Sequence, residues 1–149
     1  MLKAVLFDFN GIIINDEAVH EKLLSQLMLE ENLRPKAGEF RQLCLGRSDR
    51  ACITALLESR GRIVTPNYLD GLIARKARAY LQELETLEKL PIYPGLEDFI
   101  FNLRAAKTKM AVVSGALRSE IELVLSRTKL RDHFAVLVSG DDRVLSKPE

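Results

Sequence analysis

Apolar and polar residues follow two different patterns along this chain. Three short, continuous apolar runs predict buried parallel strands, and they lie at residues 4–7, 110–113 and 134–138. Elsewhere the apolar residues recur every three or four positions, which predicts amphipathic helices. We expect these helices at residues 16–33, 37–45, 49–60, 66–87, 96–106 and 120–127.

The strands and helices are unevenly distributed, which divides the chain into two parts. Residues 16–88 show no strand pattern, whereas helices and strands alternate after Pro91–Gly95, the strongest break in the chain. This alternation is typical of a parallel sheet in an α/β fold. We therefore expect an α/β domain formed by residues 1–14 and 91–149, interrupted by an inserted helical domain of residues 15–90.

The composition excludes some classes of partner. The chain has 22 basic and 21 acidic residues and a net charge of +1, so no charged field favours nucleic acid or an anionic membrane. No apolar run approaches the ~20 residues of a membrane span, and Met1 leads into a strand without a signal peptide. Cys44 and Cys52 have no second pair for a zinc cluster or a disulfide framework. We expect them to be reduced packing residues of a cytoplasmic protein.

Polar residues follow each predicted strand, where the carboxyl ends of parallel strands face the ligand crevice. Asp8 ends the first strand, Ser114 ends the second, and Lys147 follows the third after a short loop. A carboxylate can attack phosphorus and form an aspartyl-phosphate. A hydroxyl and a lysine can hold and neutralise the phosphate oxygens. This combination predicts phosphoryl transfer at the ends of the strands.

The same residues resemble the ordered motifs of the haloacid dehalogenase superfamily. Asp8–Gly11 is similar to its first motif, Asp-x-Asp-Gly, and Val112–Gly115 is similar to its second. Lys147-Pro148 is similar to the third motif, with Ser139–Asp142 placed before it as in many members. Asn15–His20 and the inserted helices resemble the helical-cap branch, which includes β-phosphoglucomutase and phosphoglycolate phosphatase. The resemblance extends over the whole chain and implies a Rossmann-like parallel sheet core with an inserted α-helical cap.

The resemblance implies a Mg²⁺-dependent phosphohydrolase that acts on a small phosphorylated metabolite, such as a sugar phosphate. Asp8 is then the nucleophile and a Mg²⁺ ligand, and the backbone carbonyl of Asn10 is a second ligand. Ser114, Gly115 and Lys147 would bind the phosphate. The resemblance also implies a monomer with no nucleic-acid or membrane partner.

Cap residues have two interpretations each. The resemblance implies that Arg47, Arg50 and His20 contact the substrate, and Arg50 is slightly favoured for an anion. The residues alone fit the solvated start of a helix and an ordinary helical histidine equally well or better. Asp16 is either a helix cap or a site residue. Lys76 is expected on a solvated helix face.

Two departures weaken the match. Asn10 replaces the aspartate that serves as general acid and base in family phosphatases, and an amide cannot transfer that proton. Losing such catalysis costs ~10²–10⁴-fold in rate. The chain also ends at Glu149, before the fourth motif, an acidic pair that completes the Mg²⁺ site. We expect a fragment that binds Mg²⁺ weakly and turns over poorly, with Ala4–Phe7 as an exposed sheet edge.

Four functions stay open, of which dehalogenation is the weakest. A phosphatase is favoured over a phosphomutase of the β-phosphoglucomutase type, because a mutase must bind two phosphates and protect its phosphoenzyme from water. A non-catalytic descendant that binds a phospho-ligand or a protein partner is the third alternative, and Asn10 favours it.

Overall fold

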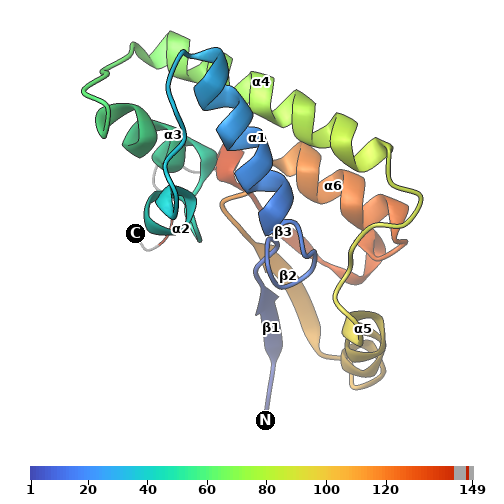
Figure 1. The fold of residues 1–149 in the computed structure, drawn as a ribbon. Coiled ribbons are helices and arrows are strands. Elements are labelled where there is room, and N and C mark those ends of the chain that lie inside the picture. Colours follow the sequence, from blue (N-terminus) through green and yellow to red (C-terminus); the bar gives the residue numbers. More distant parts are fainter. Residues whose placement is uncertain (143–146, 148–149) are drawn as a thin grey trace. The chain divides into compact units, whose positions relative to one another are not determined.

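The structure is a computed structural model that describes residues 1–142 and 147 (Figure 1). Its strands are β1 (Ala4–Phe7), β2 (Lys109–Val113) and β3 (Val136–Val138). Short 3₁₀ helices lie at Arg131–His133 and Gly140–Asp142. The α-helices are α1 (Glu17–Glu30), α2 (Glu39–Leu43), α3 (Asp49–Glu58), α4 (Pro66–Glu85), α5 (Leu96–Ala105) and α6 (Arg118–Arg127).

The chain divides into two compact units. We call them the α/β unit, which contains Met1–Asp16 and residues 87–142, and the helical unit, which contains Glu17–Thr86. Lys147 groups with the helical unit. The predicted parallel α/β fold is confirmed. The roles of the two units as catalytic core and cap stay predictions.

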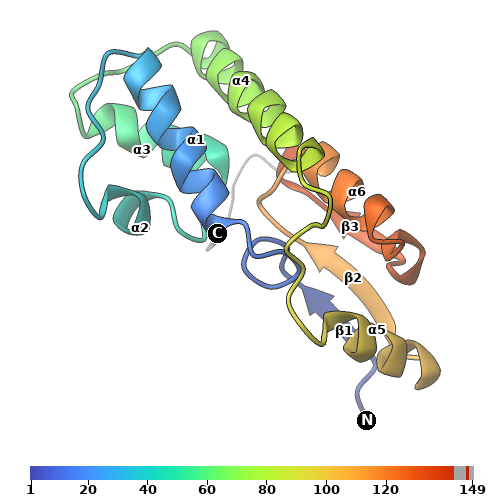
Figure 2. The same cartoon turned by 45° about the vertical axis from the view of Figure 1, so that its right-hand side comes forward.

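The sheet of the α/β unit has the order β1-β2-β3 and is parallel throughout. Figure 2 shows the arrows of β1 and β2 pointing the same way. Ala4 lies opposite Lys109, and Phe7 lies opposite Val112. Right-handed crossovers that run in one direction across a sheet place their helices on the same face. We therefore assign α5 and α6 to one face of this sheet.

The two faces of the sheet differ in burial. Phe7 and its neighbour Val112 are buried, and the Phe7 ring lies 5.9 Å from the ring of Phe99 in α5. Leu6 and Val136 point to the opposite face, where they are 68% and 53% exposed. The prediction of a buried strand at residues 4–7 was thus right for one face and wrong for the other. The expected position of β1 at an edge of the sheet is what the described residues show.

The helical unit has its own apolar core. Side-chain caps begin two of its helices: Ser48 accepts from the N–H of Ala51 before α3, and Thr65 accepts from the N–H of Tyr68 before α4. No helix in the described part of the chain is long and apolar enough to cross a membrane. The core of the unit contains Leu24, Leu27, Met28, Cys44, Cys52, Ile53, Leu56, Leu57, Leu69 and Leu72.

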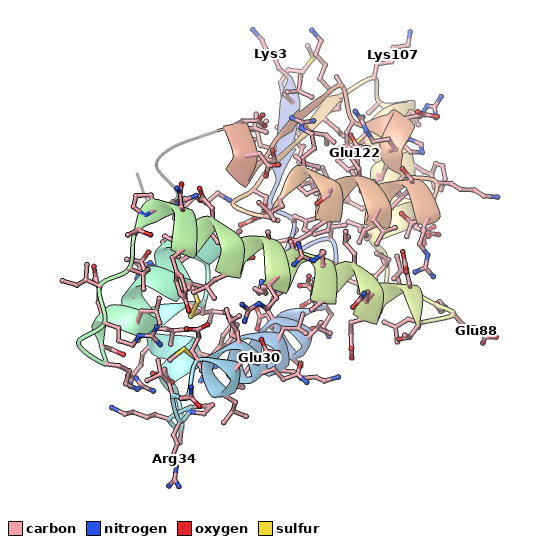
Figure 3. All side chains as sticks on the ribbon, turned by 90° about the horizontal axis from the view of Figure 1, so that it is seen from above. Lys3, Glu30, Arg34, Glu88, Lys107 and Glu122 are labelled. Atoms are coloured by element: carbon pink, nitrogen blue, oxygen red, sulfur yellow. A yellow bond between two sulfur atoms is a disulfide. The ribbon has the colours of Figure 1, made fainter. Side chains whose placement is uncertain are left out.

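Cys44 and Cys52 form a disulfide in this core (Figure 3, sulfur in yellow). The expectation that the two cysteines are reduced was wrong, because they form a disulfide. The expectation that they are buried packing residues was right. Cys44 follows α2 and Cys52 lies within α3, so their Cα atoms approach to 4.5 Å although the residues are eight apart in sequence. The sequence lacked this information because the turn after α2 decides whether the two sulfur atoms meet.

Candidate active site

Asp8 is the first residue after β1, and a tight turn follows it. The backbone N–H of Phe9 donates to Asp8 Oδ1 at 2.7 Å. The Phe9 carbonyl accepts from the N–H groups of Ile12–Ile14 at 3.3, 2.9 and 3.3 Å. Gly11 has a φ of 77°, in the left-handed region that favours glycine. Buried apolar residues of this turn anchor it, and the turn holds Asp8 at the carboxyl end of β1.

Asn10 lies in this turn, and its side chain contacts Asp16. Asn10 Nδ2 donates to Asp16 Oδ2 at 2.8 Å, and Asp16 is fully buried just before α1. A carboxylate accepts hydrogen bonds, so it orients the amide NH₂ towards itself and turns Asn10 Oδ1 away. Sequence reasoning treated the two residues separately and missed this pair.

Ser114 follows β2, and backbone groups hold it in place. Its N–H donates to the Val138 carbonyl at 2.9 Å, and its Oγ accepts from the N–H of Ala116 at 3.1 Å. A Cβ atom on Gly140 would lie 2.3 Å from the carbonyl oxygen of Gly115. Glycine at position 140 therefore lets the turns after β2 and β3 approach each other.

The turns after β1 and β2 end neighbouring strands. Since Phe7 lies opposite Val112, the parallel register brings Asp8 and Ser114 to the same end of the sheet, where the strands have their carboxyl ends. Adjacent strands lie ~4.8 Å apart. The structure thus gathers the first two predicted motifs in the α/β unit, and the chemical roles of their residues stay predictions.

A second polar cluster fixes the turn after β3. Asp142 Oδ2 accepts from the N–H and Oγ of Ser139, both at 2.8 Å, and from Arg118 at 2.9 Å. The hydrogen bonds from Ser139, aided by the Arg118 guanidinium, lower the pKa of Asp142 to about 2. Sequence reasoning missed this cluster, although a serine three residues before an aspartate is a known signal of local side-chain hydrogen bonds.

His20 lies beside the buried side chain of Lys76 in the helical unit. Lys76 Nζ lies 2.7 Å from His20 Nδ1 and 2.5 Å from Asp49 Oδ1, and the Lys76 side chain has no exposed surface. The His20 ring stacks on Tyr80 with centroids 4.7 Å apart. The prediction that Lys76 lies on a solvated face was wrong, because Asp49 offers the carboxylate that a buried ammonium group needs.

The two predicted cap arginines differ in their partners. Arg50 is exposed and forms an ion pair with Asp70, whereas Arg47 donates to the carbonyl of Leu43 at 3.2 Å. The pairing with Asp70 offsets the charge of the arginine that the sequence favoured as an anion contact. The substrate contacts of both arginines stay predictions.

The third predicted motif is described only in part. Lys147 is exposed and groups with the helical unit, so its phosphate contact stays a prediction. Pro148 and the residues between Asp142 and Lys147 lie outside the described part of the chain.

Oxygen donors dominate the turn after β1, and they suit a hard cation. Asp8 offers a carboxylate and Asn10 a backbone carbonyl. Among residues 1–142 and 147, no group of three or more His, Cys, Asp or Glu side chains forms a ready metal cage. Mg²⁺ is commonly held by one or two carboxylates together with waters and substrate phosphate. This donor set fits Mg²⁺.

Comparison with known protein families identifies the fold. The haloacid dehalogenase-like hydrolases match residues 5–149, which is nearly the whole chain. The chain belongs to this family. The predicted resemblance is thereby confirmed for the haloacid dehalogenase-like hydrolases as a whole.

Curated relatives of this chain carry names from phosphate chemistry. It is 21% identical to protein CbbY of Rhodobacter capsulatus, covering 99% of this chain and 66% of that protein. It is 22% identical to the phosphorylated carbohydrates phosphatase of Thermotoga maritima, with the same coverage. It is 22% identical to the phosphoglycolate phosphatase of Pseudomonas putida, covering 99% of this chain and 54% of that protein. The chain thus spans somewhat less than two thirds of the relatives' length.

Solved structures show the same fold. A β-phosphoglucomutase from Clostridium difficile matches with a TM-score of 0.89 at 17% identity, covering 100% of this chain and 66% of that one. An aspartate-to-asparagine mutant of CbbY from Rhodobacter sphaeroides, solved with xylulose-1,5-bisphosphate, matches with a TM-score of 0.86 at 21% identity, covering 100% and 68%. At these identities the likeness establishes the fold of the chain.

Proposed function

We propose that this chain belongs to a Mg²⁺-dependent phosphatase that acts on a small phosphorylated metabolite of the sugar-phosphate type. The observation that carries the proposal is the position of Asp8 at the carboxyl end of β1, beside Ser114 on the neighbouring strand. Ligands of open parallel sheets bind at this edge. The names of the relatives, which include two phosphatases of phosphorylated compounds, support the substrate class.

Asp8 would act as the nucleophile of a two-step transfer. One carboxylate oxygen attacks phosphorus, the bond between phosphorus and the ester oxygen breaks, and the leaving oxygen takes the electron pair. Water then attacks the aspartyl-phosphate and releases inorganic phosphate, which restores the carboxylate. Ser114 Oγ and the N–H groups around Gly115 would hold the phosphate oxygens, and Lys147 would add positive charge.

Asp8 and the Asn10 carbonyl would hold Mg²⁺. When bound, the ion would offset the repulsion between the carboxylate and the phosphate oxygens.

Asn10 limits which substrates can react. An amide has no proton to give to an alkoxide leaving group, so alkyl phosphates would be poor substrates. Acyl phosphates have leaving groups that need no acid. We therefore expect phosphorylation of Asp8 by an acyl phosphate to be the easiest step to observe.

The helical unit is proposed as the cap that helps to select the substrate, with Arg47, Arg50 and His20 as its contacts. The balanced charge of the chain supports a small-molecule substrate over nucleic acid or an anionic membrane. The proposal includes a cytoplasmic monomer. A phosphomutase would use the same first step.

One observation favours a second candidate, a non-catalytic protein that binds a phospho-ligand. The Asn10 amide is held by Asp16, so the turn after β1 is ordered without a proton-transferring group at position 10. Such a protein would keep the phosphate contacts of Ser114 and lose turnover.

The test is whether Asp8 becomes phosphorylated. The chain is incubated with acetyl phosphate and Mg²⁺, quenched in acid and mapped by peptide mass spectrometry. We expect one phosphoryl group on the peptide that contains Asp8, and none in Asp8→Asn. Asp98→Asn, which alters an exposed aspartate in α5, is the matched control and should be labelled normally. Phosphate binding in calorimetry without any label on Asp8 would favour the non-catalytic candidate.

A further inference from the structure

The disulfide between Cys44 and Cys52 closes a short segment that carries several of the helical unit's polar contacts. We call residues 45–51 the enclosed segment. It contains Ser48, whose Oγ caps α3, and Asp49, which pairs with the buried Lys76. It also contains the exposed side chains of Arg47 and Arg50. The covalent state of the two cysteines therefore sets how tightly this segment is held.

The two sulfur atoms are unequally placed. A pocket between α1, α2 and α3 is lined by Cys44, and Cys52 is not among its lining residues. The pocket is lined by the apolar side chains of Leu24, Met28, Phe40 and Leu56. The charged side chains of Glu21, Lys36 and Glu39 also line it. Cys44 is 5% exposed and Cys52 is 2% exposed. The pocket therefore leads to the Cys44 end of the disulfide, and its volume of about 30 Å³ has room for the sulfur end of a small thiol rather than for the whole molecule.

We propose that this disulfide is a thiol-exchange site, and that a small thiol entering the pocket opens the enclosed segment by attacking Cys44. Sulfur of the attacking thiolate bonds to Cys44 Sγ, the bond between Cys44 and Cys52 breaks, and Cys52 leaves with the electron pair and takes a proton. A second thiol then attacks the mixed disulfide on Cys44. Two thiols are oxidised to one disulfide, and Cys44 and Cys52 are both reduced.

Opening the disulfide frees the enclosed segment from its covalent closure. The closure stabilises the native segment mainly by restricting the unfolded chain, so its loss shifts the local equilibrium towards opening. Arg47 and Arg50 lie in this segment, and trypsin cleaves after arginine. The state of the disulfide can thus be measured as cleavage at these two positions, which requires no assumption about the proposed function.

The experiment compares oxidised and dithiothreitol-treated chain under native conditions. Brief digestion with trypsin is followed by acid quench, complete reduction and mass spectrometry of the fragments. We expect cleavage after Arg47 and Arg50 to rise roughly 10-fold or more on reduction, because the opened population sets the rate. Cleavage after Lys107, an exposed residue of the α/β unit, is the internal reference and should not change. Equal cleavage of the enclosed segment in both states would overturn the proposal.

Variants of the cysteines supply the controls. Cys44→Ala combined with Cys52→Ala should be cleaved equally with and without reductant, because no disulfide is left to respond. Two single variants test the direction of attack with hydroxyethyl disulfide as the probe. Cys52→Ala, which keeps Cys44, should form the mixed disulfide faster than Cys44→Ala, which keeps Cys52. Faster reaction of Cys52 would contradict entry through the pocket.

Discussion

The turns at the carboxyl ends of β1 and β2 and the helical unit hold their polar residues in different ways. At the strand ends, backbone groups and short turns position Asp8 and Ser114. In the helical unit, charged side chains hold one another across helices, as Lys76 and Asp49 do. Backbone positions follow from strand register, whereas ion pairs follow from the packing of whole helices. The first arrangement rests on the backbone, and the second rests on the charges of the side chains themselves.

The largest effect on activity is expected at Asn10. Its side chain pairs with Asp16 in a turn that is otherwise held by backbone hydrogen bonds. Asn10→Asp combined with Asp16→Asn exchanges the amide and the carboxyl group within the same hydrogen bond. We expect turnover of an alkyl phosphate to rise ~10²–10⁴-fold, because a general acid becomes available. The measurement is kcat/KM in the presence of Mg²⁺.

Single variants are the controls for this exchange. Asp16→Asn alone should give no gain. Asn10→Asp alone sets two carboxyl groups at hydrogen-bond distance in a partly buried pair, which favours sharing of one proton and lowers stability. A folded double variant that binds phosphate and gains no activity would show that Asn10 is not what limits the chemistry.

The helical unit predicts a large stability effect at its buried ion pair. Asp49→Asn leaves the Lys76 ammonium group buried without its carboxylate. We expect the free energy of unfolding to fall by about 3–5 kcal/mol, measured by urea denaturation.

Asp70→Asn is the matched control, since it removes the exposed carboxylate partner of Arg50. A loss of ~0.2–1 kcal/mol is expected there. Equal losses of unfolding free energy in the two variants would contradict the distinction between the buried ion pair of Lys76 and the exposed ion pair of Arg50.

A smaller effect is expected where two strand-end turns meet. Gly140→Ala brings a Cβ atom against the Gly115 carbonyl. We expect a loss of ~1–3 kcal/mol in the free energy of unfolding, because backbone must shift to accommodate it. Gly71→Ala is the control, because nothing lies within 4 Å of the added Cβ in α4. That substitution should stabilise the helix by roughly 0.5–1 kcal/mol.

The smallest effect concerns acid, through Asp142. Its pKa is lowered from 3.8 to about 2 in the folded chain, so the folded state binds fewer protons than the unfolded state between these values. The stabilising effect of the carboxylate is complete above its unfolded pKa and is lost as the pH falls towards 2. The difference in unfolding free energy between the native chain and Asp142→Asn should therefore shrink on acidification. A difference that stays constant on acidification would contradict this role of the Asp142 carboxylate.

The sequence predicted the features that local pattern determines. Apolar runs located all three strands, and strand ends located Asp8 and Ser114, because residues at the ends of neighbouring parallel strands must share an edge. Helical spacing located all six α-helices of the described residues, and each predicted bound lies within three residues of the observed one.

Features that depend on packing between distant segments could not be predicted in this way. Lys76 and Asp49 are far apart in sequence, and no periodicity links a lysine of one helix to an aspartate of another. The disulfide depends on the turn after α2, and the Asn10–Asp16 pair depends on how the turn after β1 folds back. Composition records none of these three contacts.

The pairing of β1 with β2 has a consequence for synthesis of the protein. Ala4 pairs with Lys109, so the first strand made must wait for roughly 100 further residues before its partner exists. At ribosomal rates of about 5–20 residues per second, this delay is roughly 5–20 s. The helical unit lies entirely between these two strands in sequence and can form during that time. The nascent chain therefore carries an unpaired apolar strand throughout this interval, during which β1 is open to contact with a chaperone.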